Sequence, residues 1–231
     1  MSSEPVWLFT QVLNHNDDNP GIVVRHKVTL EFVRDRDLKG PLKPVFMTAA
    51  FGMKPIGLKG DDVSKPLRVA SGGPGPSCDL GEHAPNATQH NVHSDPKGTF
   101  SSHWLVRPGK EILRTPVTQL LSLPSDTTVH FVSIHVHPFA QSLELRDLTT
   151  GKTIFKSRVK GLRRGIGLSR VTHFSSRKGI ALLKDHEYEL VSVYNNTSGV
   201  NQDSMAGMLL YLLDKNFKKP PAAQAVAPLS H

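Results

Sequence analysis

The sequence predicts an all-β fold, an antiparallel β-sandwich or jelly roll, and three observations favour this class. Short apolar runs with strand periodicity recur along the chain, with turn-forming segments between them. The 18 glycines and 17 prolines suit many turns better than long helices. No segment has the pattern of a strong amphipathic helix. Short strands at regular spacing with Gly- and Pro-rich turns are typical of sandwiches and jelly rolls.

The N-terminal part of the chain is expected to supply three strands and one long loop. Residues 6–13 and 45–51 are short apolar runs, which suit strands. Residues 22–33 alternate between apolar and polar side chains, which predicts a strand with one buried face. Residues 54–98 are rich in Gly, Pro, Ser and Asp and are expected to form a long loop.

The middle of the chain returns to a regular strand pattern. Strands are expected over residues 100–106 and 112–123, with a Pro-Gly turn between them. Residues 127–137 are rich in β-branched side chains and give the strongest strand signal.

The C-terminal part is expected to contain a hairpin and the last two strands. Residues 142–148 and 153–157 flank a turn that contains Gly151, which predicts a β-hairpin. Residues 161–179 look irregular, and the final strands are expected over residues 187–194 and 205–213.

A single domain is expected over residues 1–214, because the sequence shows no internal repeat and no second domain. The remaining residues, 215–231, turn rich in Lys, Pro and Ala and are expected to form a flexible tail. A chain of 231 residues is long enough to bury a full hydrophobic core.

The chain is basic, with 28 Lys and Arg against 20 Asp and Glu, which gives a formal charge of +8. Much of the excess lies between Lys152 and Lys178, where the only Phe, Tyr or Trp residues are Phe155 and Phe174. Single-stranded nucleic acids are bound largely by aromatic stacking. We therefore favour a solvated basic loop and expect no nucleic-acid partner, with an anionic small molecule or lipid head group as the alternative ligand of this patch.

Cysteine content and hydropathy do not specify the cellular compartment of the protein. The single cysteine, Cys78, excludes an intrachain disulfide. No run of about 20 apolar residues is present, so no membrane-spanning helix is expected. The N-terminus lacks the features of a signal peptide. We expect a periplasmic or secreted protein if a signal peptide has been removed and a cytoplasmic one if the chain is complete. No feature specifies the oligomeric state.

The motif Ser-Ile-His135-Val-His137-Pro predicts a metal site. Residues i and i+2 of a strand point to the same face, so the two imidazoles can bind one metal ion. Imidazole suits zinc, copper, iron and nickel. An iron site of the cupin kind needs a carboxylate a few residues later, but Glu144 follows at seven positions, which argues against it. Met205 offers a thioether, a ligand that selects Cu(I), so copper is favoured.

The ordered motifs around these residues resemble a known family. They are Ser-Ile-His135-Val-His137-Pro, Ser-Val-Tyr194-Asn-Asn, and Asp203-Ser-Met205 followed by an apolar strand with Tyr211. Over about residues 100–214 the chain resembles the second jelly-roll domain of the copper type II, ascorbate-dependent monooxygenases, the peptidylglycine- and dopamine-hydroxylating enzymes.

The resemblance implies one copper ion bound by His135, His137 and Met205, since the family's oxygen-activating copper is held by an HxH pair and a later methionine. It also implies O₂ and a small-molecule or peptide substrate as partners if the protein is an enzyme. The family holds its second copper in a preceding domain with a His-His pair. This sequence has no His-His dipeptide, so the electron-supplying copper is not expected.

Three functions remain open at this point. The first is a copper-dependent, monooxygenase-like oxidoreductase, and the second is a non-catalytic copper carrier or sensor. The third is a metal-free jelly-roll interaction module whose basic loop binds an acidic partner. Asp203 is a candidate for orienting a ligand histidine. A second metal site could be formed by the remaining candidate histidines, which are His15, His83, His90, His93 and His103. Surface or structural roles are the commoner interpretation of these histidines.

Overall fold

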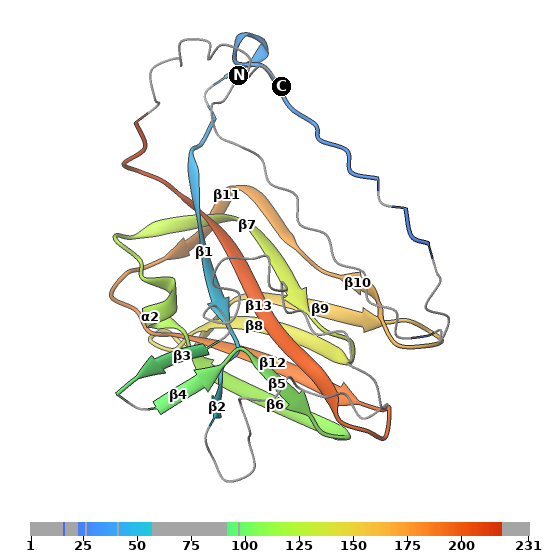
Figure 1. The fold of residues 1–231 in the computed structure, drawn as a ribbon. Coiled ribbons are helices and arrows are strands. Elements are labelled where there is room, and N and C mark those ends of the chain that lie inside the picture. The colour runs from blue at the N-terminus through green and yellow to red at the C-terminus, as the bar shows by residue number, and fades with distance from the viewer. Residues whose placement is uncertain are drawn as a thin grey trace, which may run out of the picture.

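The computed structural model describes residues 16, 23–25, 27–40, 42–56, 92–96 and 98–218. Within them the regular secondary structure consists almost entirely of antiparallel strands (Figure 1). The strands are β1 (Val45–Phe51), β2 (Lys54–Ile56), β3 (Val92–Asp95), β4 (Gly98–Ser101), β5 (His103–Val106), β6 (Gly109–Pro116), β7 (Thr127–Val136), β8 (Ala140–Asp147), β9 (Lys152–Gly161), β10 (Leu168–Val171), β11 (Phe174–Leu182), β12 (Tyr188–Asn196) and β13 (Gln202–Leu213). The described helices are the short η1 (Asp35–Asp37) and α2 (Thr118–Leu121).

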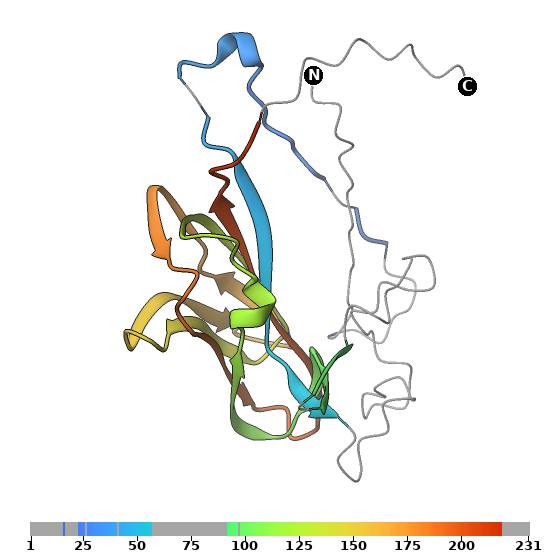
Figure 2. The ribbon, with the colours of Figure 1, turned by 90° about the vertical axis from the view of Figure 1, so that its left-hand side faces the viewer.

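The strands form two large sheets and one small one. The first sheet has the order β1-β13-β7-β11, and β5 also pairs with β13. The second has the order β10-β9-β8-β12-β6, and the small sheet has the order β2-β4-β3. Turned by 90°, the sandwich shows β1 and the β8–β9 region on opposite sides (Figure 2). The expected all-β sandwich is therefore confirmed.

The hydrophobic core lies between the two large sheets. Alternate residues of β13 are fully buried, among them Met208 and Leu210. Leu190 of β12 and Leu143 of β8 face them from the second sheet and are also fully buried. Period-2 burial of this kind is what an antiparallel sheet with one packed face requires. The outward-facing residues of β13 are consequently the odd-numbered ones.

Most of the expected strands are present. Residues 45–51 form β1, and residues 127–137 and 205–213 lie largely within β7 and β13. The hairpin is formed by β8 and β9, and its turn contains Gly151 with a φ of +70°. A positive φ explains why glycine occupies this position.

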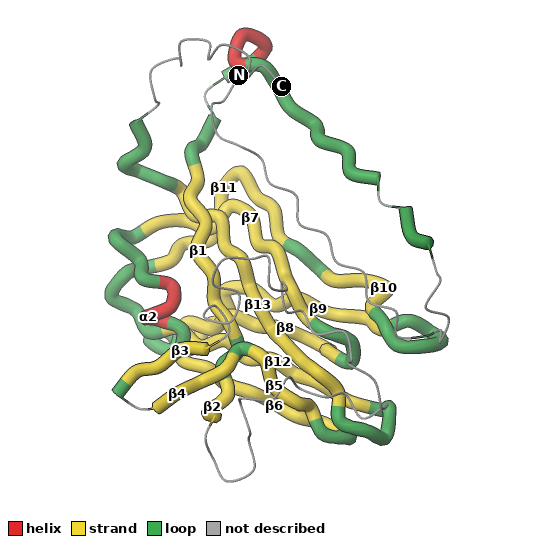
Figure 3. The backbone as a smooth tube through the Cα atoms, viewed as in Figure 1, coloured by secondary structure: helices red, strands yellow, loops and turns green. Residues whose placement is uncertain are grey.

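Several expectations differ from the structure. Residues 100–106 are not one strand, because β4 ends at Ser101 in the small sheet and β5 begins at His103 beside β13. The described part of residues 22–33 contains no strand (Figure 3). Large apolar side chains such as Phe32 are exposed there. Residues 161–179 are not one irregular segment, because they contain β10 and the start of β11, although register shifts interrupt the pairing of both strands. Residues 112–123 are not one strand: β6 ends at Pro116 and α2 follows. Proline cannot donate a backbone hydrogen bond, which limits how far a strand can continue.

The expected loop over residues 54–98 contains strands at both of its ends. Strand β2 begins it, and β3 and the first residue of β4 close it. Several expected segments lie outside the described residues. They are residues 57–91 of the loop, the strand over residues 6–13 and residues 219–231 of the tail. No helix in the described part of the chain is long and apolar enough to cross a membrane.

Candidate metal centre

Strands β7 and β13 place the three predicted ligands on the outer face of the first sheet. Gly207 of β13 pairs with His135 of β7, and the His137 N–H donates to the Met205 carbonyl oxygen at 3.3 Å. The ring centres of His135 and His137 are 5.4 Å apart. Two imidazoles bound to one metal through nitrogens at about 2 Å would have ring centres roughly 5 Å apart. The structure thus brings His135, His137 and Met205 together.

A third histidine reaches the same place from the neighbouring strand. His103 of β5 lies directly across from Met205 in the β5–β13 pairing. Its ring centre is 5.7 Å from that of His137. Met205 therefore has an imidazole on each side, because β13 runs between β5 and β7.

Asp203 links two of these imidazoles. Its Oδ1 lies 3.5 Å from Nδ1 of His103, and its Oδ2 lies 3.2 Å from Nδ1 of His137. The side chains of His103, Asp203 and His137 are only 10%, 9% and 6% exposed. Both distances exceed the 2.7–2.9 Å of a charge-assisted hydrogen bond, so the pairing is mainly electrostatic.

The carboxyl group of Asp203 is ionised at neutral pH. Burial alone would raise its pKa, but the contacts with the two imidazoles outweigh burial and lower the pKa to about 2. A buried negative charge beside nitrogen and sulfur donors favours a cation at this site. In addition, Nε2 of His103 is buried and has no hydrogen-bond partner among the described residues.

The backbone of the site is fixed from inside the sandwich. The hydroxyl of Tyr194, on β12 in the opposite sheet, donates a hydrogen bond to the Met205 carbonyl oxygen. After His137 the chain turns through Pro138 and Phe139, whose φ is +71°, and the Ala140 N–H donates to the His137 carbonyl at 3.4 Å. Proline followed by a residue with positive φ is the pattern of a type II turn. The turn and the tyrosine together fix the backbone at His137 and Met205.

The side chains of the candidate metal centre are not arranged as a complete metal-binding site in the structure. No three His, Cys, Asp or Glu side chains of the described residues converge on one point as a metal site would require. The thioether of Met205 is a donor outside that group of residue types. A ligand set here therefore needs Met205, or a rotation of one imidazole, in addition to the His135–His137 pair. His135 is exposed while His137 is buried, so solvent reaches the cluster from the His135 side.

The other candidate residues are distributed differently. His15, His83 and His90 lie outside the described residues, and so does the side chain of His93. The suggested second metal site stays a prediction. Tyr211 lies on the outer face with its ring centre 5.4 Å from that of Phe131.

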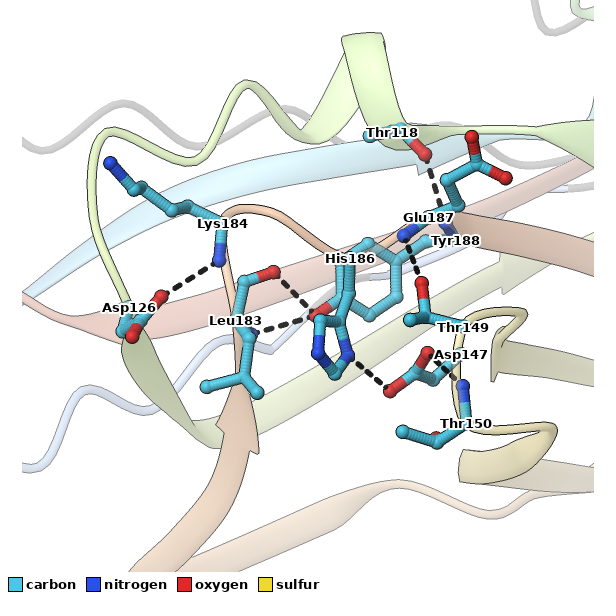
Figure 4. Close-up of polar contacts among 10 residues, drawn as sticks. All are labelled: Thr118, Asp126, Asp147, Thr149, Thr150, Leu183, Lys184, His186, Glu187 and Tyr188. Carbon is cyan, nitrogen blue, oxygen red and sulfur yellow. Dashed lines mark hydrogen bonds and ion pairs between the residues drawn. The ribbon is translucent and has the colours of Figure 1, made fainter.

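A separate polar cluster joins two turns of the sandwich (Figure 4). Nδ1 of His186 lies 2.8 Å from Oδ2 of Asp147, and Oδ1 of Asp147 accepts the Thr150 N–H at 3.0 Å. The Tyr188 hydroxyl donates to the Leu183 carbonyl at 2.8 Å. These contacts connect the β8–β9 turn with the β11–β12 turn, so the cluster has a structural role.

Comparison with family models, with curated proteins and with solved structures finds no match to this chain. The molecule is described by its fold and its site: an all-β sandwich that carries three histidines, a methionine and a carboxylate on one sheet face. His103 is the member that sequence reasoning did not place in the site. Only its pairing with Met205 across β5 and β13 brings it there.

Proposed function

We propose that the protein binds one copper ion through His135, His137 and Met205. The observation that supports this proposal is the position of these three residues on one face of adjacent strands, with the two imidazole centres 5.4 Å apart. Two imidazoles and one thioether form a donor set that suits copper, and the thioether favours Cu(I) over zinc or ferrous iron.

The order of the motifs supports the same ligand set. An HxH pair, followed by a methionine two residues after an aspartate, resembles the second jelly-roll domain of the ascorbate-dependent copper monooxygenases. Asp203 lies against Nδ1 of His137 at 3.2 Å and would orient its ring, as carboxylates commonly do for ligand histidines.

Copper loading tests this function directly. Purified protein is incubated with Cu(I) under reducing, anaerobic conditions, unbound metal is removed, and copper per chain is measured by elemental analysis. We expect one copper per chain in the unmodified protein and a large loss in His135→Ala and Met205→Leu. Met47→Leu is the matched control, because Met47 lies exposed on β1 of the same sheet. Copper at the level of a protein-free blank, or equal losses in both methionine variants, would contradict the proposal.

A second candidate function is copper-dependent oxidation of a small-molecule or peptide substrate by O₂. The exposure of His135, beside the buried His137, supports it because a reacting molecule needs access to the metal. Ascorbate-dependent oxygen consumption that requires copper and is lost in Met205→Leu would favour this oxidation. Stoichiometric copper without oxygen consumption would favour a carrier or sensor instead. A metal-free interaction module remains the alternative if no copper binds.

A further inference from the structure

His103 is buried at the candidate metal centre and has a nitrogen with no assigned role. It faces Met205 across the β5–β13 pairing, on the side opposite to His137. Its Nδ1 faces Asp203 at 3.5 Å, while its buried Nε2 has no hydrogen-bond partner among the described residues. A buried polar atom without a partner costs free energy, so such an atom calls for an explanation.

We propose that His103 is a further copper ligand, the third imidazole of the site, which it joins through Nε2. This inference rests on the proposed copper-binding function. It extends the donor set from two imidazoles and a thioether to three imidazoles and a thioether.

The carboxylate of Asp203 favours the same tautomer in the imidazoles of His103 and His137. Each Nδ1 faces one oxygen of Asp203, at 3.5 and 3.2 Å. A carboxylate at Nδ1 favours the tautomer with the proton on Nδ1 and the lone pair on Nε2, which is the form that binds a metal. Asp203 therefore selects the metal-binding tautomer of both rings at once.

The spacing of the rings is compatible with a common metal. The His103–His137 centres are 5.7 Å apart and the His135–His137 centres 5.4 Å, both near the roughly 5 Å expected for two imidazoles on one ion. The donors do not converge in the structure as it stands. Convergence of the nitrogens on one ion would require rotation of the rings about their side-chain bonds.

A fourth donor changes what the site can hold. Four protein donors fill a tetrahedral set, whereas sites that activate a bound molecule keep an open position. Imidazoles suit Cu(II), and the thioether prefers Cu(I). With His103 as a ligand the site would hold both oxidation states, as expected of a copper carrier or electron-transfer centre. Loss of His103 would weaken Cu(II) binding more than Cu(I) binding.

The test counts nitrogen ligands on Cu(II) by pulsed electron paramagnetic resonance and measures affinity by chelator competition. We expect three imidazoles in the unmodified protein and two in His103→Gln, with Cu(II) affinity reduced about tenfold or more. His173→Gln is the matched control, because His173 is exposed and its ring centre lies 6.2 Å from that of Phe131, away from the proposed ligands. Its spectrum and affinity should match those of the unmodified protein.

The outcomes separate this inference from the copper proposal itself. Two imidazoles in the unmodified protein, or an unchanged count in His103→Gln, would overturn the role of His103 while copper binding by His135 and Met205 stands. No bound copper at all would overturn both. A count of two in the unmodified protein overturns the role of His103 even if His103→Gln does not fold.

Discussion

Asp147 and Asp203 are buried carboxyl groups whose pKa values are set by their histidine neighbours. In each case burial would raise the pKa, and contacts with imidazole outweigh it, joined at Asp147 by hydrogen bonds from Thr150, so the net pKa lies below the usual range. Asp203 faces two imidazoles on the outer sheet face, whereas Asp147 faces His186 and the backbone of a turn. Asp203 therefore belongs to the candidate metal centre, and Asp147 stabilises the fold.

The Asp147–His186 pair should make the stability of the protein sensitive to acid. The folded-state pKa of Asp147 is lowered from 3.8, so its ionised form contributes stability that is fully present above the unfolded pKa. That contribution is lost as the pH falls through the lower folded pKa. We expect Asp147→Asn to reduce the free energy of unfolding by about 1–3 kcal/mol near neutral pH, and by less in strong acid.

Chemical denaturation of both proteins at neutral and at acidic pH measures this difference. Asp185→Asn is the control, because Asp185 is exposed in the adjacent turn. A stability loss in Asp147→Asn that is the same at both pH values would rule out the ionised carboxylate as its source.

Strand β11 contains an irregular stretch that interrupts its pairing with β7. Its pairing with β7 shifts register between Ser175 and Ile180, and Gly179 within that stretch has a φ of +78°. On the facing strand, Nδ1 of His130 lies 2.9 Å from the Ser176 carbonyl oxygen, and Nε2 lies 2.8 Å from Oγ1 of Thr128. Glycine is needed here both for its positive φ and because the His130 ring lies against it.

Comparison of Gly179→Ala with Gly151→Ala separates the requirement for a positive φ from the requirement for space beside Gly179. A Cβ there would lie 2.9 Å from both Cε1 of His130 and the Val129 carbonyl oxygen. Gly151→Ala is the matched control, since Gly151 has a similar φ of +70° and a Cβ on it would meet nothing within 4 Å. Each substitution should cost about 1–2 kcal/mol for the left-handed conformation, and Gly179→Ala should cost more because of the steric contact. Equal shifts in thermal denaturation would show that the His130 contact does not matter.

The same stretch explains where strand prediction from the sequence failed. Residues 127–137 could be predicted because they are rich in β-branched side chains, although the buried positions of β7 change parity between Val129 and Val132. Residues 205–213 could be predicted because they form an apolar run, which lies within β13. Residues 161–179 could not, because register shifts at Arg170 and after Ser175 interrupt the period of two. Residues 22–33 alternate well, yet their described part pairs with no described strand. Alternation reports an amphipathic pattern and does not specify a pairing partner.

Some residues of the candidate site are positioned by their own strand, and others by pairing between strands that lie far apart in the sequence. The His135–His137 pair is local, since two residues of one strand share a face. Met205 was a candidate because its thioether suits Cu(I) and because the motif order resembles a known family, and its place beside His137 depends on the β7–β13 pairing. His103 depends on the register of β5 against β13, across about a hundred residues of chain. Sequence periodicity holds no information on such registers, so His103 could be named as a candidate but not placed in the site.

Tyr194 connects the core of the sandwich to the site, and its substitution tests that connection. Its ring packs edge-on against Trp104 with centres 5.9 Å apart, and its hydroxyl donates to the Met205 carbonyl. Burial raises its pKa well above the usual range, so the hydroxyl keeps its proton as a donor. Tyr194→Phe should lower the free energy of unfolding by about 1–2 kcal/mol. It should also weaken copper binding, because the backbone at Met205 loses its support from the opposite sheet.

Tyr211→Phe provides the comparison, because Tyr211 lies on the same strand as Met205 but on the outer face, against Phe131. Denaturation and copper competition on the two variants should show both losses in Tyr194→Phe and neither in Tyr211→Phe. If Tyr194→Phe loses stability but keeps full copper affinity, the hydroxyl supports the sandwich alone. The position of Met205 would then be set within the first sheet, by its pairing with His103 and His137.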